Sequence, residues 1–157
     1  MAFTYFFVSL RWIDNGSGKS TSIEILSGEL GLQSGHATYH LKGGDARLGD
    51  PFGDEVIRKK IGVCPQHNDS LQPDLTCRET LVLFAQLKGN IAIEEGQTTD
   101  QAVSDEVDRR LSEVKFTADG DCDKPVGTFS GGMKRKLLIA IALLGDPEVI
   151  FLDEPTG

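Results

Sequence analysis

The chain has few of the features that mark membrane-spanning, disulfide-bonded or nucleic-acid-binding proteins. No apolar run in its 157 residues approaches the roughly 20 residues that a transmembrane helix needs. Its three cysteines, Cys64, Cys77 and Cys122, include no C-x-x-C pair. We therefore expect neither a disulfide framework nor a zinc site. The same cysteine pattern favours a reducing environment for the protein. The chain has only 16 basic residues and 24 acidic ones, and the resulting net charge of −8 argues against broad nucleic-acid binding.

What remains is the composition of a soluble globular domain. Apolar residues make up 39% of the chain and charged residues 25%. Residues 1–10 are apolar, but no basic residue precedes the apolar stretch and Arg11-Trp12 follow it. We interpret this segment as a strand or as misplaced sequence rather than as a signal peptide.

The chemically most specific stretch is the glycine-containing segment at residues 15–21. It matches the second half of the phosphate-binding pattern G-x-x-x-x-G-K-[ST], but Ile13 stands where the first glycine belongs. Its glycines let the backbone approach phosphates closely, Lys19 supplies a positive charge, and Ser20 supplies a hydroxyl for Mg²⁺. The alternative is a strand-to-helix turn rich in small residues, and the segment alone favours neither.

A second candidate lies at the other end of the chain. Residues 149–152 form a continuous apolar run, as expected of a strand buried on both faces, and Asp153-Glu154 follow it directly. An aspartate at such a strand end can hold Mg²⁺, and a glutamate can orient or deprotonate an attacking water. The alternative is an acidic strand end that faces solvent.

Two further features narrow the class. Ser130-Gly131-Gly132 begin a predicted helix after a polar loop, so they combine a hydroxyl with exposed N–H groups in an arrangement that suits an anion; simple N-capping by Ser130 is the alternative. Gln66 follows the predicted strand over residues 61–64, where its amide could reach a metal or water; an ordinary loop glutamine is the alternative.

Hydrophobic periodicity and breaker residues predict alternating strands and helices. We expect strands over residues 6–12, 36–41, 61–64 and 148–152, a turn over 42–45, and loops over 50–54, 90–99 and 119–124. We expect helices over residues 20–30 (ending at Gly31), 55–60, 77–88 (after a Thr76–Glu79 capping box), 101–114 and 131–144. This order predicts a mainly parallel α/β sheet with a helical subdomain beside it.

Four stretches occur in an order that resembles the nucleotide-binding domain of an ATP-binding-cassette (ABC) transporter. They are Gly18-Lys19-Ser20-Thr21, the C-P-Q-H-N segment at 64–68, the S-G-G-M-K-R-K-L segment at 130–137, and the I-F-L-D-E-P-T segment at 150–156. The residues of the second and third stretches resemble those of the A subfamily, whose members are mostly lipid exporters. The resemblance covers residue 15 to the end.

The resemblance implies an α/β fold of the P-loop NTPase type, with a mainly parallel sheet, flanking helices and a helical subdomain. It implies an atypical segment at 1–14 and a partial, truncated ABC ATPase domain at 15–157. The core would span about 15–72 and 145–157, and the helical subdomain about 73–144.

The resemblance also implies that the chain binds and hydrolyses ATP with Mg²⁺. Three residues would be catalytic: Lys19 would contact the γ-phosphate, Gln66 would sense the attacking water, and Glu154 would be the catalytic base. Ser20, Gln66 and Asp153 would serve the Mg²⁺ ion. The residues implied to contact nucleotide are Asn15, Gly16, Ser17, Gly18, Lys19, Ser20, Thr21, Ser130, Gly131 and Gly132. The implied partners are a second nucleotide-binding domain, joined head to tail around two ATP molecules, and membrane-spanning domains, with no nucleic acid. The domain would lie on the cytoplasmic face of a membrane, within a larger transporter.

Some positions depart from the family pattern. If residue 13 needs a glycine-only conformation, Ile13 would cost about 1–3 kcal/mol. We expect residues 1–14 to be foreign to the domain. We also expect this chain to lack two residues of the family: the aromatic residue that stacks on adenine, and the switch histidine, which contacts the γ-phosphate. The alternative function is therefore a truncated, catalytically incompetent remnant that binds nucleotide weakly or not at all. A soluble cassette that works on DNA or ribosomes fits the acidic charge and the motifs less well.

Overall fold

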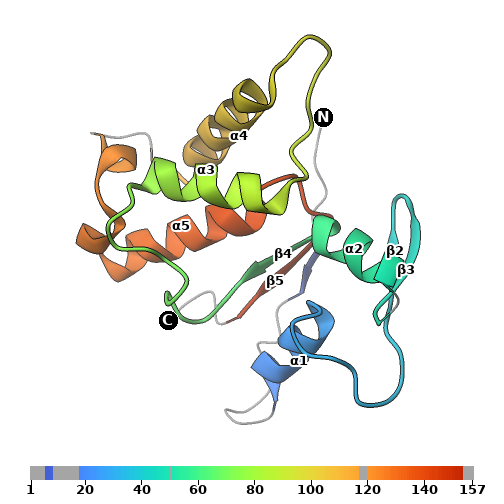
Figure 1. The fold of residues 1–157 in the computed structure, drawn as a ribbon. Helices are drawn as coiled ribbons and strands as arrows, with labels where there is room; N and C mark the ends of the chain where they lie inside the picture. Colours follow the sequence, from blue (N-terminus) through green and yellow to red (C-terminus); the bar gives the residue numbers. More distant parts are fainter. Residues whose placement is uncertain (1–5, 9–17, 50, 117–119, 154–157) are drawn as a thin grey trace. The chain divides into compact units, whose positions relative to one another are not determined.

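The computed structural model describes residues 6–8, 18–49, 51–116 and 120–153 (Figure 1). The chain divides into two compact units, which are described separately. The sheet unit comprises Met1–Gln66 and Pro147–Gly157, and the helical unit comprises His67–Asp146.

A three-stranded parallel sheet forms the centre of the sheet unit. Strand β5 (Val149–Leu152) lies between β1 (Phe6–Val8) and β4 (Ile61–Cys64), as Figure 1 shows. Val149 pairs with Phe6 on one side and with Ile61 on the other. The predicted strands at 61–64 and 148–152 are confirmed to within one residue. The predicted strand at 6–12 is confirmed for residues 6–8, and its remainder lies outside the described residues.

Helix α1 (Lys19–Leu26) is shorter than predicted. Its C-cap is Ser27, and Gly28 follows in the left-handed conformation with φ +80°. The prediction that the helix continues to about Leu30 and ends at Gly31 is therefore wrong. Gly28 stops the helix because it adopts this conformation without a steric penalty, and Leu30 is exposed outside the helix.

A β-hairpin replaces most of the turn predicted at residues 42–45. Strand β2 (Thr38–Leu41) pairs antiparallel with β3 (Gly44–Arg47), and only Lys42 and Gly43 form the turn. The expectation that residues 44 and 45 belong to the turn is wrong, because both pair with β2 in the ladder.

Helix α2 (Pro51–Lys60) shows that the loop predicted at residues 50–54 is wrong for residues 51–54, while residue 50 lies outside the described residues. Pro51 occupies the first helical position, where the missing N–H costs nothing. Gly53 is not a breaker but a point of close packing: a Cβ atom there would lie 2.1 Å from the backbone oxygen of Arg47. Glycine is therefore required for contact between α2 and the hairpin rather than for a loop.

The core of the sheet unit joins its helices to the parallel sheet and to the hairpin. It consists of Ile23, Ala46, Leu48, Ile57, Ile61 and Phe151. These residues come from α1, β3 and the residue after it, α2, β4 and β5, so the core packs α1 and β5 into one body.

The helical unit contains α3 (Cys77–Lys88), α4 (Thr99–Glu113) and α5 (Gly131–Leu143), with short 3-10 helices η1 (Asp121–Asp123) and η2 (Val126–Thr128). The capping box predicted at Thr76 and Glu79 is confirmed. Helix α4 begins two residues earlier than predicted, because Thr98 and Gln101 form a second capping box. Part of the predicted loop at 119–124 is the helix η1.

A buried ion cluster anchors the end of α5 to α4. The Arg110 guanidinium is fully buried and pairs with Glu106 (2.9 Å), Glu113 (2.7 Å) and Asp146 (2.7 Å). Arg109 also pairs with Glu106 and Asp146. Burial opposes ionisation of Asp146, but hydrogen bonds from both arginines outweigh it and lower its pKa to about 2. Asp146 is held with φ +51°, so the cluster secures an unusual backbone conformation.

Candidate functional site

Helix α1 begins with an open, glycine-capped first turn. Gly18 is the N-cap and has φ +90° and ψ 18°, a conformation that favours glycine. No side chain caps this end of the helix. The first N–H groups of a helix have no partner within it and carry partial positive charge, so this end suits an anion. Lys19 is the first residue of α1, and its side chain lies outside the described part of the structure.

Two residues from opposite ends of the chain meet beside this helix start. Ser20 Oγ donates a hydrogen bond to Asp153 Oδ2 over 2.7 Å, and 133 residues separate the two. Asp153 is 8% exposed. Its backbone N–H donates to the carbonyl of Cys64 over 3.1 Å, which holds the residue after β5 against the end of β4. The fold thus brings together two of the three residues predicted to serve a metal.

The Ser20–Asp153 pair has the chemistry that Mg²⁺ prefers. A hydroxyl and a carboxylate are hard oxygen ligands, and Mg²⁺ at nucleotide sites takes few protein ligands because phosphates and waters supply the rest. Among the residues that the structure describes, no group of three or more His, Cys, Asp or Glu side chains could hold a metal alone. The pair therefore fits a Mg²⁺ ion that arrives with a phosphate ligand better than a self-contained metal centre.

Gln66, the third predicted metal residue, follows β4 by two positions and is exposed. Strands β4 and β5 are parallel, so Gln66 and Asp153 follow strand ends at the same edge of the sheet. Ligands of open α/β sheets bind at this edge. The position of Gln66 is consistent with the predicted role, which stays a prediction.

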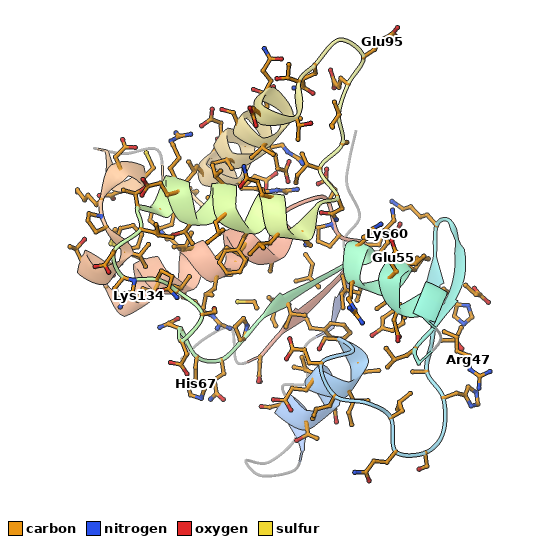
Figure 2. All side chains as sticks on the ribbon, in the orientation of Figure 1. Arg47, Glu55, Lys60, His67, Glu95 and Lys134 are labelled. Carbon is orange, nitrogen blue, oxygen red and sulfur yellow. The ribbon has the colours of Figure 1, made fainter. Side chains whose placement is uncertain are left out.

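The residues Ser130, Gly131 and Gly132, which were predicted to contact nucleotide and are called the signature below, lie in the helical unit at the start of α5. Ser130 is the N-cap, and its Oγ accepts a hydrogen bond from the backbone N–H of Met133 over 3.2 Å. Ser130, Gly131 and Gly132 are exposed, and Lys134 follows them on the helix (Figure 2). The N-capping role of Ser130 is confirmed, and the anion site stays a prediction with which the exposed glycines are consistent.

The residue before the signature anchors this segment. Phe129 is buried, and its ring stacks on that of Phe116, with centroids 5.5 Å apart and planes 23° apart. This contact fixes where α5 begins, and therefore where Ser130 stands in the helical unit. The contact is not predictable from the sequence, because nothing local to either phenylalanine indicates its partner.

Several predicted site residues cannot be placed. Asn15, Gly16, Ser17 and Glu154, and also Ile13, lie outside the described residues. Thr21 lies in the first turn of α1 and is exposed. The site that can be described is therefore the metal end of the predicted nucleotide site, with its phosphate loop represented from Gly18 onward.

Residues 14–157 match the sequence model of the ABC transporter family. The chain belongs to this family. The membership predicted from the four motifs is therefore confirmed. No helix in the described part of the chain is both long and apolar enough to cross a membrane.

Curated relatives belong to the A subfamily. The chain is 41% identical to ABC transporter A family member 2 of Arabidopsis thaliana over 142 residues, which cover 90% of this chain and 13% of that protein. It is 42% identical to human ATP-binding cassette sub-family A member 10 over 144 residues, which cover 91% of this chain and 8% of that protein. The chain thus spans a small fraction of the relatives that it matches.

Two solved structures show the fold. One is an ATP-binding cassette, solved as a dimer in a post-hydrolysis state bound to ADP and Pi; it has a TM-score of 0.70 and 24% identity, and the match covers 91% of this chain and 58% of that one. The other is a dimeric bacterial ABC transporter cassette with a TM-score of 0.66 and 23% identity, over 98% of this chain and 60% of that one. The predicted P-loop NTPase-type fold of an ABC ATPase domain is confirmed.

Proposed function

We propose that the chain is a Mg²⁺-dependent ATP-binding and ATP-hydrolysing domain that powers an ABC transporter. The observation that carries this proposal is the 2.7 Å contact between Ser20 and Asp153 beside the glycine-capped start of α1. In a chain of this family, that contact joins the phosphate-loop hydroxyl to the acidic strand end, which are the two halves of one metal–nucleotide site.

Each residue has a distinct task in the proposed site. The backbone N–H groups of residues 15–21 surround the phosphates, and Lys19 neutralises the β- and γ-phosphate oxygens. Ser20 and Asp153 hold Mg²⁺, assisted by Gln66. The ion, when bound, offsets the charge that develops on the phosphate oxygens. Glu154 accepts a proton from the attacking water.

The proposed partners follow from the signature segment. Ser130, Gly131 and Gly132 present a hydroxyl and N–H groups at an exposed helix start, which suits the γ-phosphate of ATP bound to a second, head-to-tail nucleotide-binding domain. Both solved neighbours are described as dimers, which supports such an assembly. The domain would divide into a core at about 15–72 and 145–157 and a helical subdomain at about 73–144.

The similarity to A-family transporters supports two further parts of the proposal. Membrane-spanning domains would be the mechanical partner, with this domain on the cytoplasmic face, and the transported substrate would be a lipid. Lipid export is tested with the complete transporter in vesicles, by following ATP-dependent movement of a fluorescent phospholipid between leaflets. Loss of movement in Glu154→Gln is expected, and absence of movement in the unmodified protein would contradict lipid export.

Nucleotide binding is tested on the chain itself with a fluorescent ATP analogue and Mg²⁺. We expect saturable binding that unlabelled ATP displaces and that Asp153→Asn weakens, because asparagine can still accept from Ser20 but lacks the charge that holds the metal. Asp74→Asn, at an exposed position in the helical unit, is the matched control and should bind normally. Absence of displaceable binding would instead support the incompetent remnant suggested by Ile13.

A further inference from the structure

Two of the three cysteines lie in neighbouring elements of the helical unit. Cys77 is the first residue of α3, and Cys122 is the middle residue of η1. None of the three cysteines forms a disulfide in the structure. The third, Cys64, belongs to the sheet unit and ends β4.

Backbone contacts hold the two segments side by side. Thr76 and Pro125 form an antiparallel bridge. The N–H of Val126 donates to the carbonyl of Leu75 over 2.8 Å, and the N–H of Gly127 donates to that of Pro73 over 2.8 Å. The chain after η1 therefore runs antiparallel to the chain before α3. This register carries Cys122 toward the start of α3, where Cys77 lies.

A side-chain contact also joins η1 to the start of α3. The Nε atom of Arg78, the residue after Cys77, lies 3.9 Å from Oδ1 of Asp123, the residue after Cys122. Arg78 also donates to Asp108 over 2.7 Å, so α4 holds it in place. The residue next to Cys77 in the chain thus pairs with the residue next to Cys122.

The two thiols differ in environment and affect one another. Cys77 is fully buried, whereas Cys122 is partly exposed. Burial, and after it the negative charge of Cys122, raise the pKa of the Cys77 thiol to about 12 against the opposing effect of Arg78. An oxidant in solution therefore reaches Cys122 first, and Cys77 is reached through its neighbour.

We propose that Cys77 and Cys122 form a reversible intrachain disulfide that links the start of α3 to η1. The oxidant is a low-molecular-weight disulfide such as oxidised glutathione. The Cys122 thiolate attacks it, forms a mixed disulfide and releases one glutathione thiol. Cys77 then loses its proton and attacks the sulfur of Cys122, expelling the second glutathione thiol. Two protein thiols are oxidised while one glutathione disulfide is reduced to two thiols.

The disulfide would act on the segment that leads to the signature. Residues 122–130 run through η2 to Ser130, and Phe129 is already fixed by its stack on Phe116. A covalent link at Cys122 would restrain the other end of this short segment. The high pKa of Cys77 makes the second step slow near neutral pH and faster as pH rises, because the thiolate is the attacking species.

The test is peptide mapping of the whole chain after equilibration with oxidised and reduced glutathione. After blocking of remaining thiols with iodoacetamide, mass spectrometry should find a Cys77–Cys122 linked peptide, absent after dithiothreitol, and Cys64 alkylated. In Cys77→Ala, Cys122 should keep a glutathione adduct. In Cys122→Ser, Cys77 should stay a thiol that is alkylated only after unfolding.

The unmodified chain alone can overturn the proposal, so a variant that fails to fold does not rescue it. Accumulation of a glutathione adduct on Cys122 without the linked peptide would contradict the proposal. So would disulfides that involve Cys64 as often as Cys122. Far-UV circular dichroism of the two variants verifies that their thiol reactivity is that of a folded chain.

Discussion

Ser20 Oγ and Asp153 Oδ2 lie 2.7 Å apart, and this contact joins the start of α1 to the end of β5. Both groups are oxygen ligands that suit Mg²⁺ bound to phosphates. We predict that Ser20→Ala weakens binding of a fluorescent ATP analogue about tenfold in Mg²⁺, a loss of about 1.4 kcal/mol. The same titration in EDTA should show no difference from the unmodified chain.

Ser22→Ala is the matched control for this prediction. Ser22 lies on the same helix, and its hydroxyl donates only to the carbonyl of Gly18, over 2.8 Å. Its removal should leave the Mg²⁺-dependent part of binding intact. Equal losses in Mg²⁺ and in EDTA for Ser20→Ala would show that this hydroxyl serves the fold rather than the metal.

The buried Arg110 dominates the ion cluster of the helical unit. Its guanidinium pairs with Glu106, which is 6% exposed, and with Asp146. Arg110→Met should lower the free energy of unfolding by up to about 3–5 kcal/mol, because the buried Glu106 loses one of its two arginine partners and keeps only Arg109. Urea denaturation measures this loss.

The control is an ion pair of the same type on the surface. Lys59 pairs over 2.7 Å with Glu55, which Figure 2 labels on α2, and both side chains are mostly exposed. Lys59→Met should change the free energy of unfolding by no more than about 0.5 kcal/mol. Similar losses in the two variants would contradict the view that burial makes the Arg110 cluster important.

Lys88 provides a test of pH dependence. Its Nζ donates to the carbonyl of Leu144 over 2.7 Å, and burial, followed by the charge of Arg110, lowers its pKa to about 8 despite the attraction of Glu106. The unfolded value is 10.5, so between pH 8 and 10.5 the unfolded chain binds more protons than the folded chain. The contribution of Lys88 to the free energy of unfolding should therefore increase with pH over this range.

Comparison with Lys88→Met isolates this pH-dependent contribution of Lys88 to stability. The unmodified chain should gain stability relative to the variant as pH increases from 8 to 10, measured by urea denaturation at each pH. Lys59→Met should follow the unmodified chain throughout. A difference between the unmodified chain and Lys88→Met that stays constant with pH would mean that Lys88 titrates normally.

Gly53 tests why α2 can pack against the hairpin. A Cβ atom at this position would lie 2.1 Å from the Arg47 backbone oxygen, which cannot rotate away. Gly53→Ala should destabilise the chain by about 1–3 kcal/mol, although alanine favours helices. Gly43→Ala, where nothing lies within 4 Å of the added atom, should be close to neutral in the same thermal or urea melts.

Local patterns predicted the elements whose structure depends on local interactions. Strands β4 and β5 are short apolar runs, and the capping box at Thr76 determines where α3 begins, so all three were predictable. Helix α2 was misjudged because Pro51 and Gly53 resemble breakers, whereas the first begins the helix and the second packs against Arg47. That packing arises from tertiary structure, which no local pattern contains.

The same distinction applies to the candidate site. Ser20 and Asp153 were both predicted to serve Mg²⁺, since the motifs that contain them have residue types and positions suited to that task, and the structure brings them together. The bond from the Asp153 N–H to the Cys64 carbonyl and the stack of Phe129 on Phe116 were not predicted. Both join segments distant in sequence, and neither partner carries a local signal.

The most direct test of the proposed function is the affinity of the chain for a fluorescent ATP analogue with Mg²⁺, compared with Lys19→Ala. Lys19 begins α1 next to Gly18 and supplies the one side-chain positive charge of the proposed phosphate loop. We predict displaceable binding in the unmodified chain and a loss of at least about tenfold in the variant. No binding, or binding that Lys19→Ala leaves unchanged, would contradict the proposal that this loop holds ATP.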